Sequence, residues 1–349
     1  MVKEVLDRYG RPVKILRITV THRCNYNCFF CHMEGEDPSD KTELSHNEII
    51  LVAKAFSRIG VREYKITGGE PLLREDIEDI INSLKYVVGA SDVSLTTNGF
   101  FLEEKVERLR KAGLDRINIS IHSLRRDIYK KITGHDQLDK VLRGFYRARE
   151  LDFKKIKINV VILKGLNDSE IPDFIELIRG DDRLILQLIE LHPVGFGKNV
   201  FNKYFMSLED IERKIIELSS TFDIRRDLHN RPIYHLRDGG YIEIVKPVSN
   251  PIFCAGCTRL RLTSNGYIRP CLVKNSIGVD LKPILRSEKL DEEKKINEII
   301  KMIYKVIEIR EPSAMWRIDP VLDYLVSKYN INYDLRQRVR INIPKRPVD

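Results

Sequence analysis

The chain has 349 residues and a formal net charge of +9, and it is long enough to bury a large core in one barrel-sized domain plus a smaller region. No apolar run reaches the roughly 18 residues of a membrane-spanning helix. No signal peptide opens the sequence, so we expect a cytoplasmic protein with reduced cysteines. The positive charge favours an anionic partner, either nucleic acid or a phosphorylated small molecule, and its even spread along the chain does not resemble a nucleic-acid-binding arm.

Residues 14 to about 220 alternate short apolar runs with longer amphipathic stretches. The predicted strands are Ile15–Thr21, Glu63–Thr67, Val93–Thr97, Ile117–His122, Ile156–Leu163 and Leu184–Leu191. The predicted helices are Asn47–Ile59, Asp76–Val88, Leu102–Ala112, Asp139–Leu151, Glu170–Arg179 and Leu208–Ser219. Six such strand–helix units predict parallel strands with right-handed crossovers, and they are too few for a closed eight-stranded barrel. The predicted fold class is therefore α/β, with an incomplete (β/α)6 parallel barrel over residues 1–220.

The periodicity changes in residues 221–349, which we expect to form a C-terminal region of their own. Two strands and two helices are predicted there: Tyr241–Val248, Arg259–Thr263, Leu290–Arg310 and Val321–Tyr329. The pair Asn265-Gly266, directly after the second strand, is a hairpin-turn signal. The basic, proline-containing tail over residues 336–349 receives no predicted structure or role.

Polar and glycine-rich residues follow all six predicted barrel strands. They are Thr21-His22-Arg23-Cys24, Thr67-Gly68-Gly69-Glu70-Pro71, Thr96-Thr97-Asn98-Gly99, Ser120-Ile121-His122-Ser123, Lys164-Gly165-Leu166-Asn167 and Glu190-Leu191-His192-Pro193. In parallel barrels the working groups sit at the carboxyl ends of the strands. The sequence therefore predicts a functional site at this end of the barrel.

All six cysteines fall into two triplets. The first triplet is Cys24, Cys28 and Cys31, and the second is Cys254, Cys257 and Cys271. A fully held [4Fe–4S] cluster takes four thiolates, so three leave one iron open to bind another molecule. Catalytic zinc sites use an open position in the same way. The two triplets predict two [4Fe–4S] clusters that can each hold a reactant.

Structural zinc and disulfides are the other uses of these cysteines. A zinc site closes with four ligands, so His22 or His32 would have to complete the first triplet, and His229 or His235 the second. Zinc stays open as an alternative, more so for the second triplet. Disulfides are disfavoured because a long chain without a secretion signal has little need of them.

The loop from Cys24 to Cys31, placed directly after a barrel strand, resembles the radical S-adenosylmethionine superfamily. In that family the open iron binds the amino and carboxylate groups of S-adenosylmethionine, and an electron from the cluster breaks a carbon–sulfur bond to give methionine and a 5′-deoxyadenosyl radical. Gly68-Gly69-Glu70-Pro71 resembles the family's methionine-binding motif, where glycines let the backbone approach the ligand. The resemblance implies that S-adenosylmethionine is bound by Phe30, Gly69, Glu70, Ser120 and His192, the last at a position where many relatives carry methionine.

The second triplet, with the spacing Cys-x2-Cys-x13-Cys, resembles the GTP 3′,8-cyclases of molybdenum cofactor biosynthesis, and this likeness extends to about Leu285. In those enzymes the open iron of the second cluster binds the guanine of GTP. The resemblance implies GTP contacts from Arg17, Lys65, Thr96, Lys157, Arg259 and Arg261, with catalytic roles for Arg17, Arg259 and Arg261. Arg259 and Arg261 alternate, so a strand would direct both to one face. From the residues alone, salt bridges on an exposed face would explain them equally well. Clustered arginines and lysines suit a triphosphate.

The activity that this resemblance implies is conversion of GTP to 3′,8-cyclo-7,8-dihydro-GTP. Hydrogen leaves C3′ of GTP, C3′ then adds to C8 of guanine, and a reduction step yields the product. The implied partners are an electron donor, such as a reductase, ferredoxin or flavodoxin-like protein, and a downstream cyclic pyranopterin monophosphate synthase. A homodimer is allowed. No membrane or nucleic acid is expected as a partner.

Besides His192, the chain departs from the family pattern in two places. Family members end in a Gly-Gly tail that enters the active site, whereas no glycine follows Gly278 here, and we expect Arg338 or Arg340 to contribute in its place. His122 stands where relatives more often have aspartate. Two other functions stay open. One is a radical enzyme that modifies a peptide or an RNA base, although the peptide enzymes usually carry more auxiliary cysteines. The other is a non-enzymatic zinc-containing protein that binds nucleic acid.

Overall fold

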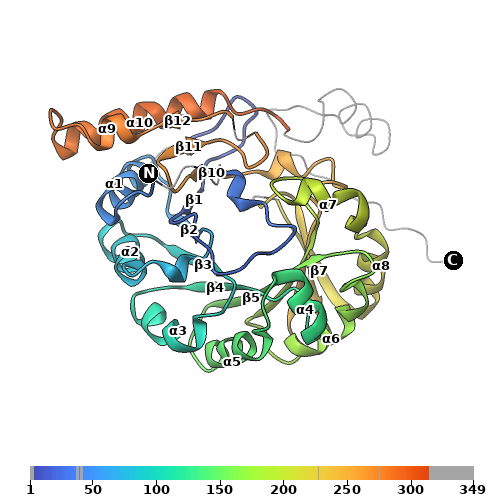
Figure 1. Ribbon diagram of the computed structural model, residues 1–349. Helices are drawn as coiled ribbons and strands as arrows, with labels where there is room; N and C mark the ends of the chain where they lie inside the picture. The colour runs from blue at the N-terminus through green and yellow to red at the C-terminus, as the bar shows by residue number, and fades with distance from the viewer. Residues whose placement is uncertain (1–3, 37–38, 40–41, 227, 275, 314–349) are drawn as a thin grey trace.

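A computed structural model describes residues 4–36, 39, 42–226, 228–274 and 276–313 (Figure 1). Three features predicted from the sequence therefore lie outside the described residues: the helix near Val321–Tyr329, the basic tail 336–349, and the contribution of Arg338 or Arg340.

The strands join into one twelve-stranded sheet in the order β12-β11-β10-β1-β2-β3-β4-β5-β6-β9-β8-β7. Their bounds are β1 Ile15–Thr19, β2 Glu63–Thr67, β3 Asp92–Thr97, β4 Arg116–Ser120, β5 Lys155–Ile162, β6 Leu184–Glu190, β7 Ser219–Arg225, β8 Arg231–Leu236, β9 Tyr241–Val245, β10 Arg259–Leu262, β11 Tyr267–Arg269 and β12 Val279–Asp280. Strands β1 to β6 pair in parallel in chain order, which confirms the predicted partial barrel.

Two strands from the C-terminal third extend the parallel part of the sheet. Strand β10 pairs in parallel with β1, and β9 pairs in parallel with β6. The antiparallel strands β11 and β12 follow on one side, and β8 and β7 on the other. The predicted hairpin after β10 is confirmed, because Gly266 has a φ of 90° in the turn that leads to β11.

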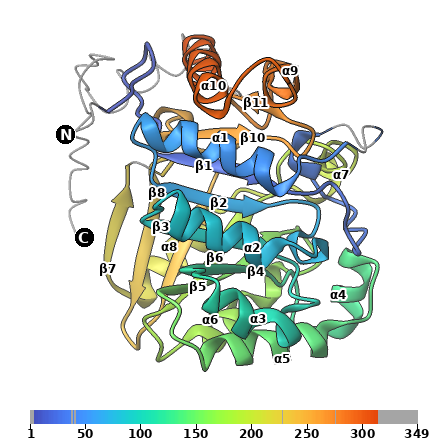
Figure 2. The same ribbon diagram turned by 90° about the vertical axis from the view of Figure 1, so that its left-hand side faces the viewer.

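Helices cover the outer side of the curved sheet, as Figures 1 and 2 show. They include α1 His46–Arg58, α2 Ile77–Asn82, α3 Leu102–Lys111, α5 Leu138–Arg149, α6 Ile171–Ile178, α8 Glu209–Leu218 and α10 Glu292–Glu308. The predicted helix at Asp76–Val88 changes from α to π geometry at Ser83. Helices α4 (Arg126–Thr133) and α7 (Gly197–Tyr204) were not predicted from the sequence.

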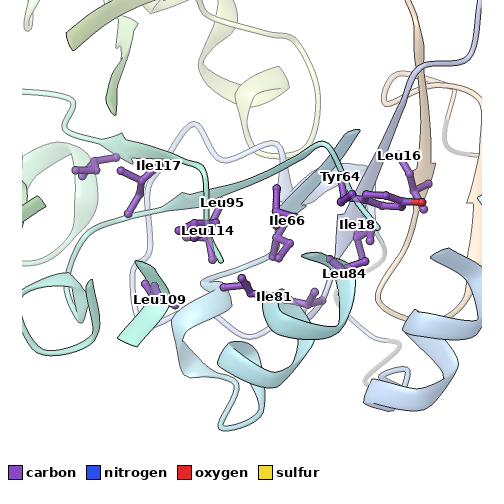
Figure 3. Packing of buried hydrophobic residues seen from close by; sticks show 14 of the residues in the cluster. Leu16, Ile18, Tyr64, Ile66, Ile81, Leu84, Leu95, Leu109, Leu114 and Ile117 are labelled. Atoms are coloured by element: carbon purple, nitrogen blue, oxygen red, sulfur yellow. The ribbon is translucent and has the colours of Figure 1, made fainter. Parts of the chain in front are cut away.

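Alternation along the strands separates an apolar outer face from a charged inner face. Leu16 and Ile18 of β1 and Tyr64 and Ile66 of β2 are fully buried against the helices (Figure 3). The residues between them, Arg17 and Lys65 among others, therefore point to the inside of the barrel. The same period in β10 buries Leu260 and Leu262 and directs the two arginines of that strand inward.

Helix α10 packs against α1 beside β10 and β11. Its first turn forms two ion pairs with α1. Glu292 lies 2.6 Å from Lys54, and Glu293 pairs with Arg58. Among the described residues, no helix combines the length and the apolar character that crossing a membrane requires.

Candidate active site

The first triplet lies in the segment between β1 and α1, at the carboxyl end of β1. Figures 1 and 2 show this blue segment passing across the end of the barrel to which the parallel strands point. The backbone turns tightly between Cys28 and Cys31, where the Cys31 amide donates a 3.0 Å hydrogen bond to the Cys28 carbonyl. The amides of Tyr26 and Met33 point at the Sγ atoms of Cys24 and Cys31, each at 3.4 Å.

The donor set of this loop fits an iron–sulfur cluster. Burial raises the pKa of Cys24 to about 11, and the negative charges of Glu70 and Cys31 act in the same direction. Burial and the charges of the other two cysteines also raise the pKa of Cys28. Buried thiolates that repel one another are unfavourable alone, and a cationic metal centre stabilises them. Cys24, Cys28 and Cys31 would hold a [4Fe–4S] cluster here.

The glycine-rich turn after β2 packs directly on the start of the cysteine loop. The Gly69 amide donates a 2.9 Å hydrogen bond to the Thr21 carbonyl, and a Cβ at position 69 would lie 1.9 Å from the carbonyl oxygen of Arg23. Only glycine allows this approach. Glu70 is 1% exposed, and its carboxylate accepts hydrogen bonds from Leu72 N, Thr97 Oγ1 and Asn98 N at 2.7–3.0 Å. Its carboxylate therefore ties the turn to β3.

The other residues predicted to bind S-adenosylmethionine also lie at the carboxyl ends of strands. Ser120 is the last residue of β4, and His192 lies two residues after β6. Burial lowers the pKa of His192 to about 3, and its Nδ1 is buried without a hydrogen-bond partner among the described residues. The ring of Phe30 meets that of His122 edge to face, with the centroids 4.9 Å apart. Roles for these residues stay predictions.

The second triplet lines one pocket near the end of α10, together with Arg11 and Arg310. Cys254 and Cys257 lie in the turn before β10, and Cys271 follows β11. Because β11 is antiparallel to β10, the chain returns Cys271 to the edge where β10 begins. Cys271 lies 17 positions after Cys254 in the sequence, and the fold brings all three cysteines together around one pocket.

Two arginines support this turn. Arg11 Nη1 donates a 3.0 Å hydrogen bond to the Cys254 carbonyl, and Arg310 Nη2 donates one of 2.7 Å to the Cys257 carbonyl. Burial alone would raise the pKa of Cys257, but the charges of Arg310 and Arg11 outweigh it and hold the pKa below its usual value. A thiolate is therefore favoured here, as a second [4Fe–4S] cluster requires.

The two triplets lie at opposite ends of the parallel strands. Strands β1 and β10 are parallel neighbours, with Arg17 in register with Arg261. The first triplet follows the carboxyl end of β1, whereas Cys257 precedes the amino end of β10. The inward-facing arginines of these two strands therefore lie between the two triplets.

Positive side chains gather on the inner face of the sheet. Lys65, Lys157, Arg231 and Arg259 line one cavity, called the cationic cavity below. Burial lowers the pKa of Lys65 well below its usual value, and the charges of Arg17, Arg259, Lys157 and Arg231 lower it further. The Nε atoms of Arg17, Arg231 and Arg259 are buried without a hydrogen-bond partner in the described chain. A bound polyanion would satisfy such donors.

The structure thus brings together five of the six residues predicted to contact GTP. Three of them line the cationic cavity, while Arg17 and Arg261 both contact the carboxylate of Glu34 at 2.5 Å. Thr96 lies one strand away, 3.5 Å from the Asn118 amide nitrogen.

Sequence reasoning missed four charged or polar neighbours of this site. Arg225, Arg231 and Glu243 come from β7, β8 and β9, and Gln187 comes from β6. Glu243 is fully buried, pairs with Lys157, and lies 3.2 Å from Arg225. Apolar and polar residues do not alternate cleanly in Arg231–Leu236, because Ile233 shares a face with Arg231, so no clear sequence signal marked Arg231 as inward-facing.

The described residues contain no three histidine, cysteine or carboxylate side chains that converge as a single metal ion would require. His235, one of the two candidates to complete a zinc site at the second triplet, instead lies 3.3 Å from Asp182. His229 is buried and stacks on Phe253, with ring centroids 4.3 Å apart.

Comparison with known proteins gives a consistent result. A model of the Radical SAM superfamily matches residues 18–178, and a model described as Molybdenum Cofactor Synthesis C matches residues 184–316. The fold is similar to that of Streptococcus suis SuiB bound to S-adenosylmethionine, with a TM-score of 0.59 and 16% identity over 89% of this chain and 79% of that one.

Two relatives have much higher identity to this chain. "Probable GTP 3′,8-cyclase" of Sulfurisphaera tokodaii is 45% identical over 316 residues, which are 90% of this chain and 98% of that protein. The protein of the same description from Metallosphaera sedula is 43% identical, over 88% of this chain and 96% of its own length. The chain therefore belongs to the GTP 3′,8-cyclase family within the radical SAM superfamily.

Proposed function

We propose that this protein is a GTP 3′,8-cyclase, which converts GTP to 3′,8-cyclo-7,8-dihydro-GTP in the first step of molybdenum cofactor biosynthesis. It uses S-adenosylmethionine and two [4Fe–4S] clusters. Family membership, with high coverage of both this chain and its relatives, supports this activity over modification of a peptide or an RNA base and over a zinc-containing nucleic-acid-binding protein.

One structural observation carries the proposal for how the residues act. The two cysteine triplets lie at opposite ends of the parallel strands, and arginines and lysines occupy the inner face of the sheet between them. A radical precursor bound at one end and a nucleotide bound at the other would therefore meet across a cationic, water-poor space. Fixing two reactants in this way removes most of the entropic cost of bringing them together.

When bound, the first cluster and S-adenosylmethionine would supply the chemistry that removes one hydrogen atom from C3′ of GTP. C3′ would then bond to C8 of guanine, and one electron from the electron donor together with a proton would complete 3′,8-cyclo-7,8-dihydro-GTP. The chain's own residues bind and orient. Lys65, Lys157 and Arg259 would neutralise the triphosphate, and Arg17 and Arg261 would hold it from the side of the first triplet. The second triplet would fix guanine through its cluster.

Several further assignments are proposals of the same kind. An electron donor, such as a ferredoxin, a flavodoxin-like protein or a reductase, would reduce the first cluster, and a cyclic pyranopterin monophosphate synthase would consume the product. We place the protein in the cytoplasm and allow a homodimer. Residues 1–220 would act on S-adenosylmethionine and residues 221–349 would contribute the second cluster.

Anaerobic incubation with S-adenosylmethionine, a reductant and GTP tests the proposal. Wild-type protein should form the cyclised nucleotide together with 5′-deoxyadenosine, and Cys271→Ala should form 5′-deoxyadenosine slowly without any cyclised product. If wild-type protein cleaves S-adenosylmethionine and leaves GTP unchanged, the substrate is wrong. If Cys271→Ala still cyclises GTP, the second triplet does not hold the nucleotide.

A further inference from the structure

Glu34 joins the loop of the first triplet to the two arginines that lie between the triplets. Its Oε1 accepts hydrogen bonds from Arg17 Nη2 at 2.5 Å and from Thr67 Oγ1 at 3.0 Å. Its Oε2 accepts one from Arg261 Nη1 at 2.5 Å. The side chain is 2% exposed. One carboxylate thus connects β1, β2 and β10 at the inner face of the sheet.

The backbone at Glu34 is strained, and the surroundings hold it there. Glu34 lies three residues beyond Cys31 and has a φ of 50°, a left-handed conformation that is unfavourable for a non-glycine residue. His32 Nδ1 accepts a 3.0 Å hydrogen bond from the Glu34 amide. Arg269 Nη1 donates a 2.9 Å hydrogen bond to the Gly35 carbonyl. Strain that persists because several contacts enforce it is typical of functional positions.

The charges make Glu34 more than a packing residue. Two partly buried guanidiniums face one buried carboxylate, so the group of three keeps a net positive charge that a triphosphate can bind. Glu34 also occupies one Nη atom on each arginine, which fixes how the remaining donors point. A carboxylate in this place reduces the attraction for an anion while it orients the groups that bind the anion.

We propose that Glu34 is a positioning residue, which orients Arg17 and Arg261 toward the nucleotide and fixes their distance from the first triplet. This inference rests on the proposed function, because it assigns those arginines to the nucleotide. The cost of the carboxylate is weaker binding of GTP, and its benefit is a nucleotide held in the geometry that reacts. Binding and turnover should therefore respond to Glu34 in opposite directions.

Two substitutions separate the charge of Glu34 from its reach. Glu34→Gln keeps the size and removes the charge, so GTP should bind roughly fivefold more tightly, while cyclisation kcat falls by at least about tenfold. Glu34→Asp keeps the charge but cannot reach both arginines, so kcat should fall while the Kd for GTP stays within about twofold of wild type. In both variants, more 5′-deoxyadenosine should form per cyclised product.

Glu36→Gln is the matched control. Glu36 is a buried carboxylate at the end of the same turn, and its hydrogen bonds go to Ser264 N and Ser264 Oγ, at 2.5–3.2 Å, instead of to an arginine. Glu36→Gln should lower the melting temperature. It should leave unchanged both the Kd for GTP and the amount of 5′-deoxyadenosine formed per cyclised product. The three variants and wild type are reconstituted with iron and sulfide, and GTP binding is measured by equilibrium titration without reductant.

Binding and turnover that weaken together in Glu34→Gln, in proportion to lost folded protein, would overturn the proposal in favour of a structural role. Unchanged kcat in both Glu34 variants would also overturn it. If Glu34→Gln does not fold, Glu34→Asp decides alone, through its kcat at unchanged Kd. Wild-type protein that neither binds nor cyclises GTP would instead refute the proposed function, so the two failures are distinguishable.

Discussion

Arg310, the second residue after α10, donates a 2.7 Å hydrogen bond to the backbone carbonyl of Cys257. Its guanidinium is 2% exposed, and its Nη1 lies 3.1 Å from the Asp7 carboxylate. Arg310 thus links Asp7, near the start of the described chain, to the turn that carries Cys257. The second cluster should depend on this contact.

Arg310→Met should lose the second cluster and keep the first. The substitution removes a buried charged hydrogen bond, which typically contributes about 2 kcal/mol, and leaves the turn around Cys257 without its support. Iron content after anaerobic reconstitution should fall from about eight to about four per chain. Lys305→Met, at an exposed position of α10, is the control and should keep full iron content. Equal iron content in the two variants would contradict this role for Arg310.

Gly69→Ala should weaken binding of S-adenosylmethionine. A Cβ at position 69 would lie 1.9 Å from the Arg23 carbonyl oxygen, so the turn must move away from the cysteine loop. We expect at least a tenfold weaker Kd for S-adenosylmethionine, which equilibrium titration of reconstituted protein would measure.

Gly165→Ala provides the comparison for that change. Gly165 has a φ of 70°, but a Cβ there meets nothing within 4 Å, so alanine adds backbone strain of roughly 1 kcal/mol without steric overlap. This variant should lose some thermal stability and bind S-adenosylmethionine as wild type does. Wild-type affinity in Gly69→Ala would show that the close approach is not needed for binding.

GTP affinity should fall as the pH rises through about 8. Burial lowers the pKa of Lys157 to about 8, although the neighbouring Glu243 acts in the opposite direction. Below this pH the ammonium is charged and attracts the triphosphate, and above it the amine is neutral. Binding isotherms between pH 7 and about 9 should therefore weaken several-fold for wild type.

Lys157→Arg tests whether that pH dependence belongs to Lys157. Arginine stays charged throughout the range, so the Kd of this variant for GTP should change little between pH 7 and about 9. A profile that is identical in the two proteins would assign the titration to another group, or to the nucleotide itself.

The partial barrel could be predicted because its strands and helices have clear periods and glycine stop signals. The first triplet and Gly69 could be placed because they follow β1 and β2 directly, and parallel strands bring such residues to one edge. The alternate spacing of Arg259 and Arg261 predicted that one face of a strand carries both arginines, but not that this face is the inner one. The position of β10 beside β1 could not be predicted, because their parallel pairing joins residues more than 240 positions apart.

Residues that act through distant contacts carried no local signal. Glu34 lies in a three-residue turn, and its arginine partners come from strands 17 residues before it and 227 residues after it. Arg231 and Glu243 lie on strands at the far side of the sheet order, where short strands alternate less clearly. Arg310 closes a helix pattern, and only the fold shows that it is buried on Cys257.

Transfer of deuterium from GTP tests the central claim most directly. Protein reconstituted anaerobically is incubated with S-adenosylmethionine, a reductant and GTP deuterated at C3′, and 5′-deoxyadenosine is analysed by mass spectrometry. If the nucleotide lies between the two triplets as proposed, 5′-deoxyadenosine should carry one deuterium and the cyclised product should have lost it. Unlabelled 5′-deoxyadenosine, formed at the same rate with and without GTP, would contradict the account.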